Sequence, residues 1–223
     1  MKRIQKVLPL AEAMAEITSG SRVMVGSFGL CGYPDMLVDA LAESNVTGLT
    51  VISNDLGNPN QGLGRLLTNG KIKGLIGTYY NWNTDVAENY NAGRIFVKVL
   101  PQGTFSEAIR AAGAGIPAFY AAAGAGTMLE EGEETRVING RTYIYRESIS
   151  ADFALIKAYK ADKLGNLIYY KTGRNFNPLM AMAAKCVIVQ VQEIVAAGEL
   201  DPEQIITPHL FVDILVKEDS AHD

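Results

Sequence analysis

Residues 23–34 read Val23-Met24-Val25-Gly26-Ser27-Phe28-Gly29-Leu30-Cys31-Gly32-Tyr33-Pro34. An apolar run is followed by glycines at every third position, and the chain then enters a segment of helical character at 34–41. Glycine can adopt positive φ angles and leaves backbone N–H groups open to a ligand. A helix that begins just beyond would add N–H donors that favour a negative charge. The pattern predicts a buried strand, a ligand-binding loop and a helix, although a strand-to-helix turn without a ligand fits it as well.

Apolar runs of strand length alternate with helix-like segments along the chain. The expected strands are 23–25, 49–53, 73–78, 95–100, 153–158 and 186–191, and the expected helices are 8–18, 34–44, 61–69, 83–92, 104–113 and 178–184. The strand segments are β-branched or almost continuously apolar, which is typical of strands covered on both faces. We therefore expect an α/β fold with an open, mostly parallel sheet and flanking helices. Asn139-Gly140 interrupts this alternation and predicts a small β-hairpin over 137–145.

Composition limits the class of protein. The chain has 223 residues, 48% hydrophobic and 20% charged, and we expect one compact domain over 1–223. Its net charge of −4 and pI near 5.3 argue against a nucleic-acid partner. No apolar run approaches the roughly 20 residues that cross a bilayer, so no membrane partner is expected. Two cysteines, and Pro9 and Glu12 interrupting any signal-peptide core, favour a cytoplasmic location.

Polar segments follow several expected strands, where parallel sheets gather their functional side chains. Asn54-Asp55 follows the strand at 49–53, and Gln102-Gly103 follows the strand at 95–100. A further polar segment covers 174–177. Amide, hydroxyl and glycine groups suit the binding of a carboxylate or a thioester carbonyl, but they are poor at proton transfer near neutral pH.

Groups that could form a covalent bond or move a proton are scarce. The two histidines, His209 and His222, stand near the C-terminus in no recognisable catalytic arrangement. Cys31 has no neighbouring cation or base, so we interpret it as a packing residue. No zinc-type cluster of cysteine and histidine is present, and we expect no metal site. Any catalytic chemistry must therefore come from a carboxylate of this chain or from a partner.

The polar motifs together resemble the A (α) subunit of the family I CoA-transferases, of the 3-oxoacid type. The resemblance rests on the glycine loop, Ser53-Asn54-Asp55, Pro101-Gln102-Gly103-Thr104 and Arg174-Asn175-Phe176-Asn177, and it runs from about residue 3 to residue 217. It implies a heterotetramer or larger assembly with a B (β) subunit. The assembly moves CoA between an acyl-CoA and a short-chain carboxylic acid, such as the 3-oxoacid acetoacetate. The coenzyme A thioester is a substrate, and no prosthetic group is implied.

The resemblance also implies how the work is divided. In this family a glutamate of the B subunit, within a Ser-Glu-Asn-Gly pattern, forms a glutamyl-CoA thioester in a ping-pong reaction. Nothing in this chain matches that pattern, so we expect no catalytic residue here. Gln102 would bind a substrate carboxylate with Asn54, Asp55 and Gly103 beside it, although Asp55 could instead cap a turn. The CoA-binding loop would comprise Gly26, Ser27, Phe28, Gly29, Leu30, Cys31 and Gly32, although this loop could also serve the packing between subunits.

Three segments depart from the family pattern and leave the acyl substrate open. Ser27 replaces a glycine of Gly-Gly-Phe, and 121–124 read Ala-Ala-Ala-Gly in place of Thr-Pro-Thr-Gly. The segment 78–83, Thr-Tyr-Tyr-Asn-Trp-Asn, replaces Ser-Tyr-x-Gly. The aromatic residues Tyr79, Tyr80, Trp82 and Tyr90 could line an acyl pocket, lie at an interface between subunits or cover the core.

Two functions of other classes stay open at this point. The same type of fold occurs in sugar-phosphate isomerases and regulators, so the chain could be a non-catalytic module that binds CoA or a sugar phosphate. It could also be a self-sufficient thioesterase that uses Glu107 or Glu147. The module predicts no transfer after a B subunit is added, and the thioesterase predicts release of CoA by this chain alone.

Overall fold

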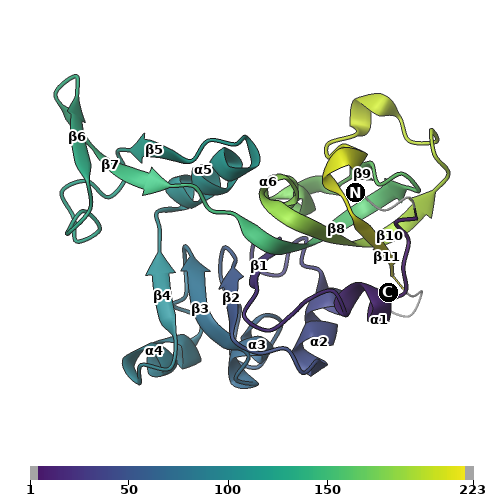
Figure 1. Ribbon diagram of the computed structural model, residues 1–223, viewed down its shortest axis with the longest axis horizontal. Coiled ribbons are helices and arrows are strands. Elements are labelled where there is room, and N and C mark those ends of the chain that lie inside the picture. The colour runs from purple at the N-terminus through teal and green to yellow at the C-terminus, as the bar shows by residue number, and fades with distance from the viewer. Residues whose placement is uncertain (1–4, 219–223) are drawn as a thin grey trace.

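The apolar segment before the glycine loop is the central strand of the sheet. The computed structural model describes residues 5–218. Seven of its strands lie parallel in the order β11-β10-β8-β1-β2-β3-β4 (Figure 1). Their bounds are β1 Arg22–Val25, β2 Leu49–Ile52, β3 Ile72–Gly77, β4 Phe96–Val99, β8 Ala151–Asp162, β10 Ala184–Val195 and β11 Ile214–Lys217. The expected mostly parallel α/β sheet is confirmed.

Strand β1 is also the point at which the strand order reverses. β2, β3 and β4 follow on one side of it, and β8, β10 and β11 lie on the other. In register, Val23 pairs with Val51 of β2 and with Phe153 of β8. Open α/β sheets bind ligands in the crevice beyond the carboxyl ends of the strands at such a reversal. The glycine loop leaves β1 at that crevice.

Helices cover both faces of the sheet and enclose two cores (Figure 1). Their bounds are α1 Leu10–Met14, α2 Asp35–Glu43, α3 Gly64–Thr68, α4 Thr84–Asn91, α5 Gln102–Gly113 and α6 Asn177–Ala183. Val23 and Val25 belong to the core that includes Leu37 of α2, whereas Met24 belongs to the core that includes Phe105 of α5. Burial on both faces is the reason that the strand segments are almost continuously apolar.

A second sheet extends away from the parallel one, at the end of the molecule where β6 is labelled in Figure 1. Strands β5 (Ala118–Ala121), β7 (Arg141–Glu147) and β6 (Thr135–Ile138) lie antiparallel in that order, and we call them the small sheet. The turn between β6 and β7 has φ values of 51° at Asn139 and 76° at Gly140. These left-handed conformations suit asparagine and glycine, and the hairpin predicted on this pair is confirmed.

The remaining differences concern the length and the number of elements. The expected helix at 8–18 is shortened to α1, and β8 and β10 each extend to 12 residues because they pair along their whole length. Strands β5, β9 and β11 were not expected. The shorter elements are β9 Leu167–Ile168, which pairs antiparallel with β8, and the 3₁₀ turns η1 Lys171–Arg174, η2 Pro202–Gln204 and η3 His209–Phe211.

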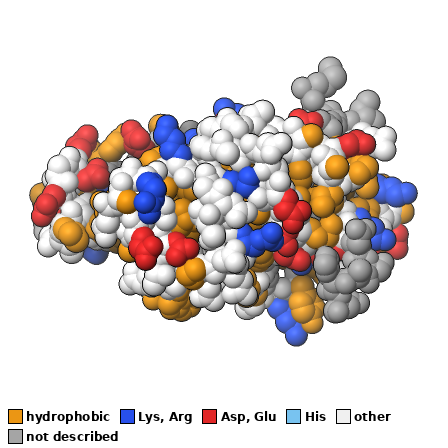
Figure 2. Space-filling model, turned by 90° about the horizontal axis from the view of Figure 1, so that it is seen from below, with side chains coloured by type: hydrophobic (Ala, Val, Ile, Leu, Met, Phe, Trp, Pro, Cys, Tyr) orange, Lys and Arg blue, Asp and Glu red, His pale blue; other side chains and the backbone are white. Residues whose placement is uncertain are grey.

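The surface and helix lengths bear on possible partners. Figure 2 shows Lys and Arg interspersed with Asp and Glu, with no continuous basic area on the face in view. No helix within residues 5–218 is long and apolar enough to cross a membrane. The same residues contain no group of three or more His, Cys, Asp and Glu side chains that could hold a metal ion. His222 lies outside the described residues.

Candidate active site

Four neighbouring strands deliver their following residues to one cavity. Its volume is about 630 Å³, and it lies at the carboxyl ends of β1, β2, β3 and β4. Its walls are Phe28-Gly29, Asn54-Asp55, Thr78-Tyr79 with Trp82, the segment 99–102, and Leu129 from the loop between β5 and β6. Gln102, Asn54 and Asp55, which are far apart in the sequence, therefore line the same space.

Three polar side chains form a connected group at one end of the cavity, which we call the amide cluster: Asn54, Thr78 and Gln102. Gln102 donates through Nε2 to Asn54 Oδ1 at 3.0 Å, and Thr78 Oγ1 lies 3.0 Å from the same oxygen. Asn54 Nδ2 in turn donates to Asp55 Oδ2 at 2.9 Å. These bonds fix which way both amides face, so the second N–H of Gln102 Nε2 is left for a ligand.

Gln102 is also the first residue of α5, and this adds main-chain donors. Pro101 precedes the helix and provides no side-chain cap. The first N–H groups of a helix have no acceptor within the helix, and its dipole favours a negative charge there. The Gln102 side chain and the start of α5 therefore offer neutral donors next to the wall that Pro101 and Gln102 form. Gly103 is the second residue of α5 and does not line the cavity.

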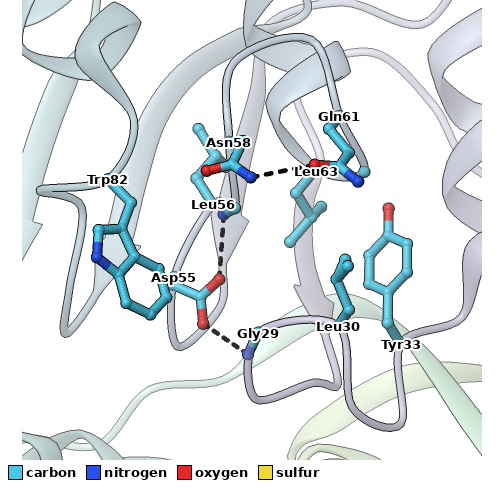
Figure 3. Close-up of a pocket in the computed structure, with 11 residues that line it drawn as sticks. Gly29, Leu30, Tyr33, Asp55, Leu56, Asn58, Gln61, Leu63 and Trp82 are labelled. Carbon is cyan, nitrogen blue, oxygen red and sulfur yellow. Dashed lines mark hydrogen bonds between the residues drawn. The ribbon is translucent and has the colours of Figure 1, made fainter.

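Asp55 is held by the protein on both carboxylate oxygens. Oδ2 accepts from Gly29 N–H at 2.9 Å as well as from Asn54, and Oδ1 accepts from Gly57 N–H at 3.1 Å. Figure 3 shows the Asp55 carboxylate between the Gly29 turn and the loop after β2. The bond to the N–H two residues ahead is an Asx turn, the capping role that the sequence left open. Asp55 therefore both lines the cavity and fixes the glycine loop above it.

Glycine is needed at the three loop positions for different physical reasons. A Cβ on Gly26 would lie 1.9 Å from Asn177 Oδ1. Gly32 has φ +63°, and its Cβ would lie 2.3 Å from the Gly173 carbonyl oxygen. Gly29 has φ +58° with open space around it, and it is the one of the three that lines the cavity. Two glycines thus permit packing against the segment 173–177, and one shapes the turn that faces the cavity.

Most N–H groups of this loop that the sequence suggested for a ligand are already bonded. Phe28 and Cys31 each donate to the other's carbonyl oxygen at 3.2 Å, and Gly29 donates to Asp55. At the start of α2, Met36 N–H donates to Gln190 Oε1 at 3.0 Å and Asp35 supplies negative charge, so groups of the protein itself occupy this helix start. The helix start that faces the cavity is that of α5.

The other members of the expected CoA-binding loop lie at different depths. Ser27 is 1% exposed, lines no part of the cavity, and its Oγ has no hydrogen-bond partner in the described structure. Phe28 and Leu30 are exposed. Leu30, Gly29 and Trp82 help line a second hollow of about 200 Å³ beside the first (Figure 3). Cys31 is exposed, so its interpretation as a packing residue is wrong. Its carbonyl oxygen accepts a bond from Asn175 Nδ2 at 2.9 Å.

The structure separates the four aromatic residues that the sequence grouped together. Tyr79 and Trp82 line the cavity, with their ring centroids 5.2 Å apart in an edge-to-face arrangement. Tyr80 belongs to the core, where burial and the nearby Asp55 charge raise the pKa of its phenol above the usual range. Tyr90 is exposed on α4 and lines neither hollow.

Glu107 and Glu147, the carboxylates of the thioesterase hypothesis, do not line this cavity. Glu107 pairs with Arg110 at 2.6 Å, and the hydrogen bond from Arg110 lowers the pKa of the Glu107 carboxyl. His209 lies on η3, where its main-chain N–H donates to Asn166. Thr78, Val99 and Leu129 line the cavity but were not singled out from the sequence.

Known proteins are similar to this chain in sequence. The A subunit of the succinyl-CoA:3-ketoacid coenzyme A transferase of Xanthomonas campestris is 48% identical over 200 residues, which cover 90% of this chain and 83% of that protein. The A subunit of the 3-oxoadipate CoA-transferase of Pseudomonas putida is 48% identical over 214 residues, which cover 95% and 93%.

Solved structures agree on the architecture. An acyl-CoA transferase from Escherichia coli O157:H7, in a thioester complex with CoA, superposes with a TM-score of 0.85 at 22% identity. The match covers 98% of this chain and 49% of that one, so this chain spans about half its length. The glutaconate coenzyme A-transferase of Acidaminococcus fermentans gives 0.84 at 22% identity, over 95% of this chain and 75% of that one. These likenesses show the fold alone. The sequence model of the coenzyme A transferases matches residues 7–218, and the chain therefore belongs to the coenzyme A transferase family.

Proposed function

We propose that this chain is the A (α) subunit of a heteromeric CoA-transferase. The enzyme moves CoA between an acyl-CoA and a short-chain carboxylic acid, of which acetoacetate and other 3-oxoacids are the first candidates. The observation that carries the proposal is that Gln102, the first residue of α5, lines a cavity at the strand reversal with its amide oriented by Asn54. The two relatives at 48% identity, each named as the A component of such an enzyme, support the same conclusion.

In this proposal Gln102 orients the acid. Its free N–H, with the N–H groups that begin α5, donates to a carboxylate oxygen or to the oxygen that gains charge during the reaction. Asn54 holds the Gln102 amide in that direction through its Oδ1. Asp55 keeps the Gly29 turn in place, and the loop 26–32 forms the wall past which the CoA thioester enters. Gly103 takes part through the helix start rather than through a side chain.

The covalent steps belong to a glutamate of the partner B subunit. Its carboxylate attacks the thioester carbonyl carbon and expels CoA as the thiolate, leaving a mixed anhydride. The thiolate then attacks the glutamyl carbonyl of the anhydride and releases the first acid, which gives a glutamyl-CoA thioester. A second acid reverses both steps. Asp55 is the only carboxylate of the described residues that line the cavity, and its three hydrogen bonds make it a poor nucleophile.

The proposal also includes the assembly of the enzyme and its location. The active enzyme contains A and B subunits in a heterotetramer or a larger complex, acts in the cytoplasm and carries no prosthetic group. The single domain of this chain supplies binding and orientation, and the partner supplies the nucleophile.

Intact-mass spectrometry tests the proposal. Acetoacetyl-CoA is incubated with the purified chain in one sample, and with the copurified complex of this chain and its B subunit in another. We expect a hydroxylamine-sensitive CoA adduct on the B subunit of the complex and no adduct on this chain in either sample. An adduct on this chain would overturn the assignment of the nucleophile. Absence of transfer between acids by the complex would favour a non-catalytic binding module instead.

A further inference from the structure

The cavity is lined by a small polar group and a larger apolar set of side chains. The amide cluster and the start of α5 supply the polar donors to which the reacting carboxyl group would bind. The apolar lining includes the edge-to-face pair Tyr79 and Trp82, together with Phe28, Val99 and Leu129. An acid whose carboxyl group binds to the amide cluster would therefore have aromatic and aliphatic walls available for its remaining carbon atoms.

Cations are missing from both hollows. None of the described residues that line the cavity, or the second hollow beside it, is lysine, arginine or histidine. The one charged group shared by the two hollows is Asp55, whose carboxylate is bonded to Asn54 Nδ2 and to two main-chain N–H groups. A second carboxylate on the substrate would therefore meet apolar walls and no cation from the residues of this chain that line the hollows.

Two guanidinium groups that interact with residues of these walls are already in ion pairs. Arg146 donates to the carbonyl oxygen of Leu129 at 2.9 Å and pairs with Glu133 at 2.7 Å, and its side chain is 6% exposed. Arg65, whose charge reaches Tyr33 of the second hollow, pairs with Asp39 and Glu43. Neither can turn toward a distal carboxylate without breaking an ion pair and leaving a carboxylate unpaired.

We propose that this cavity selects monocarboxylic acyl groups with a short apolar tail over dicarboxylic ones, with Tyr79, Trp82 and Val99 as the residues that set this preference. The inference rests on the proposed function and narrows its substrate class. It separates this chain from the two relatives at 48% identity, whose names specify succinyl-CoA and 3-oxoadipate, both with a second carboxylate. The segment 78–83, which departs from the family pattern, supplies two of the three residues.

The first experiment compares acceptor acids. The complex of this chain with its B subunit is given acetyl-CoA as donor and butyrate, acetoacetate, succinate or 3-oxoadipate as acceptor. We expect kcat/KM for butyrate and acetoacetate to exceed that for succinate and 3-oxoadipate by at least about tenfold, because an unpaired polar group is excluded more strongly than a missing methylene. Equal or better use of either dicarboxylic acid would overturn the inference while leaving the proposed function intact. No transfer to any acid would refute both.

Variants then locate the preference in the cavity. Trp82→Ala should lower kcat/KM for butyrate by about tenfold and affect acetate less, because acetate has no tail to contact the ring. The matched control is Tyr90→Ala, an exposed aromatic residue outside both hollows, which should change neither. Equal losses for butyrate and acetate in Trp82→Ala would show that the ring does not contact the tail, and would contradict the assignment.

A charge substitution gives the reciprocal test. Val99 is 45% exposed at the end of β4, so Val99→Arg can place a guanidinium in the cavity without burying it. We expect the butyrate-to-succinate ratio of kcat/KM to fall by about tenfold, as a distal carboxylate gains a partner. Val137→Arg adds the same charge on β6, at 68% exposure and away from the cavity, and should leave the ratio unchanged. An identical ratio in the two variants would remove Val99 from the tail site.

Discussion

The glycine loop separates two polar regions that are built in opposite ways. On the cavity side, the amide cluster presents neutral donors, and the one carboxylate, Asp55, is bonded to N–H groups. On the other side lies a hollow lined by Gly32, Asp35 and Lys157. There Lys157 Nζ pairs with Asp35 at 3.1 Å and with Glu218 at 2.7 Å, and Gln190 donates to both carboxylates. We call this second region the charged cluster.

The difference shows where the chain uses its charges. In the charged cluster one lysine is shared by two carboxylates and the Gln190 amide donates to both, so these groups bond to one another and join α2, β8 and β10. In the amide cluster the protein supplies donors without a counter-charge, so the negative charge has to come with the substrate. Changes in the amide cluster should therefore alter catalysis with little effect on stability. Changes in the charged cluster should alter stability with little effect on catalysis.

The largest expected effect is on catalysis, from Gln102→Ala. Removing one donor to a developing charge should lower kcat/KM of the complex by about tenfold to a thousandfold. The unfolding midpoint should stay close to wild type, because Gln102 is an exposed residue at a helix start. Gln204→Ala on η2, an exposed glutamine far from the cavity in the sequence, is the control. Activity within twofold of wild type would take Gln102 out of the site.

The second effect is on stability, from Gly26→Ala. The added methyl group would overlap Asn177 Oδ1, and Asn177 is fully buried and bonded to Lys157 N–H, so it cannot simply move away. Overpacking of this kind should lower the free energy of unfolding by about 1–3 kcal/mol. Gly103→Ala, where a Cβ meets nothing within 4 Å, is the matched control and should stay within about 0.5 kcal/mol. Equal urea midpoints for the two variants would mean that the loop has room to shift.

Sequence alone predicted the parts of this site that depend on strand ends. Asn54 and Gln102 follow β2 and β4, and the carboxyl ends of parallel strands meet at one edge, so their approach could be anticipated. The hairpin followed from the φ angles that Asn139-Gly140 accepts. These are local signals that the tertiary structure preserves.

The remaining features depend on contacts between distant segments. Gly26 and Gly32 suggest a ligand-binding loop, but the structure needs glycine there because a Cβ would overlap Asn177 or Gly173. These contacts join distant parts of the chain, since the bond from Asn177 Nδ2 to Gly32 O spans 145 positions. Leu129 reaches the cavity from the loop between β5 and β6, and no periodicity of the sequence predicts this position. Likewise, nothing in the order Tyr79-Tyr80-Asn81-Trp82 tells which ring turns to the cavity and which to the core.

The smallest expected effect is a change in pH dependence, from Lys157→Met. Burial opposes the charge on Asp35, but hydrogen bonds from Gln190 and Lys157 outweigh it and hold the pKa of Asp35 below its usual value. Burial likewise opposes the charge on Lys157, yet its bonds to Glu218 and Asp35 raise its pKa. The contribution of Asp35 to the free energy of unfolding is thus fully present above the unfolded pKa of about 3.9, and it is lost as the pH falls through the lower folded pKa. The Lys157 contribution is present below about 10.4 and is lost as the pH rises through the higher folded value.

Lys157→Met should lower the free energy of unfolding at pH 7 by less than about 1 kcal/mol, because the cluster is partly open to solvent. The difference from wild type should shrink as the pH falls from about 4 through the lowered folded pKa of Asp35, because protonation of Asp35 removes its ion pair with Lys157. Lys73→Met removes the same charge from an exposed position of β3 and should show no such convergence. If the two variants gave parallel curves of unfolding free energy against pH, the contrast across the glycine loop would be one of packing and not of charge.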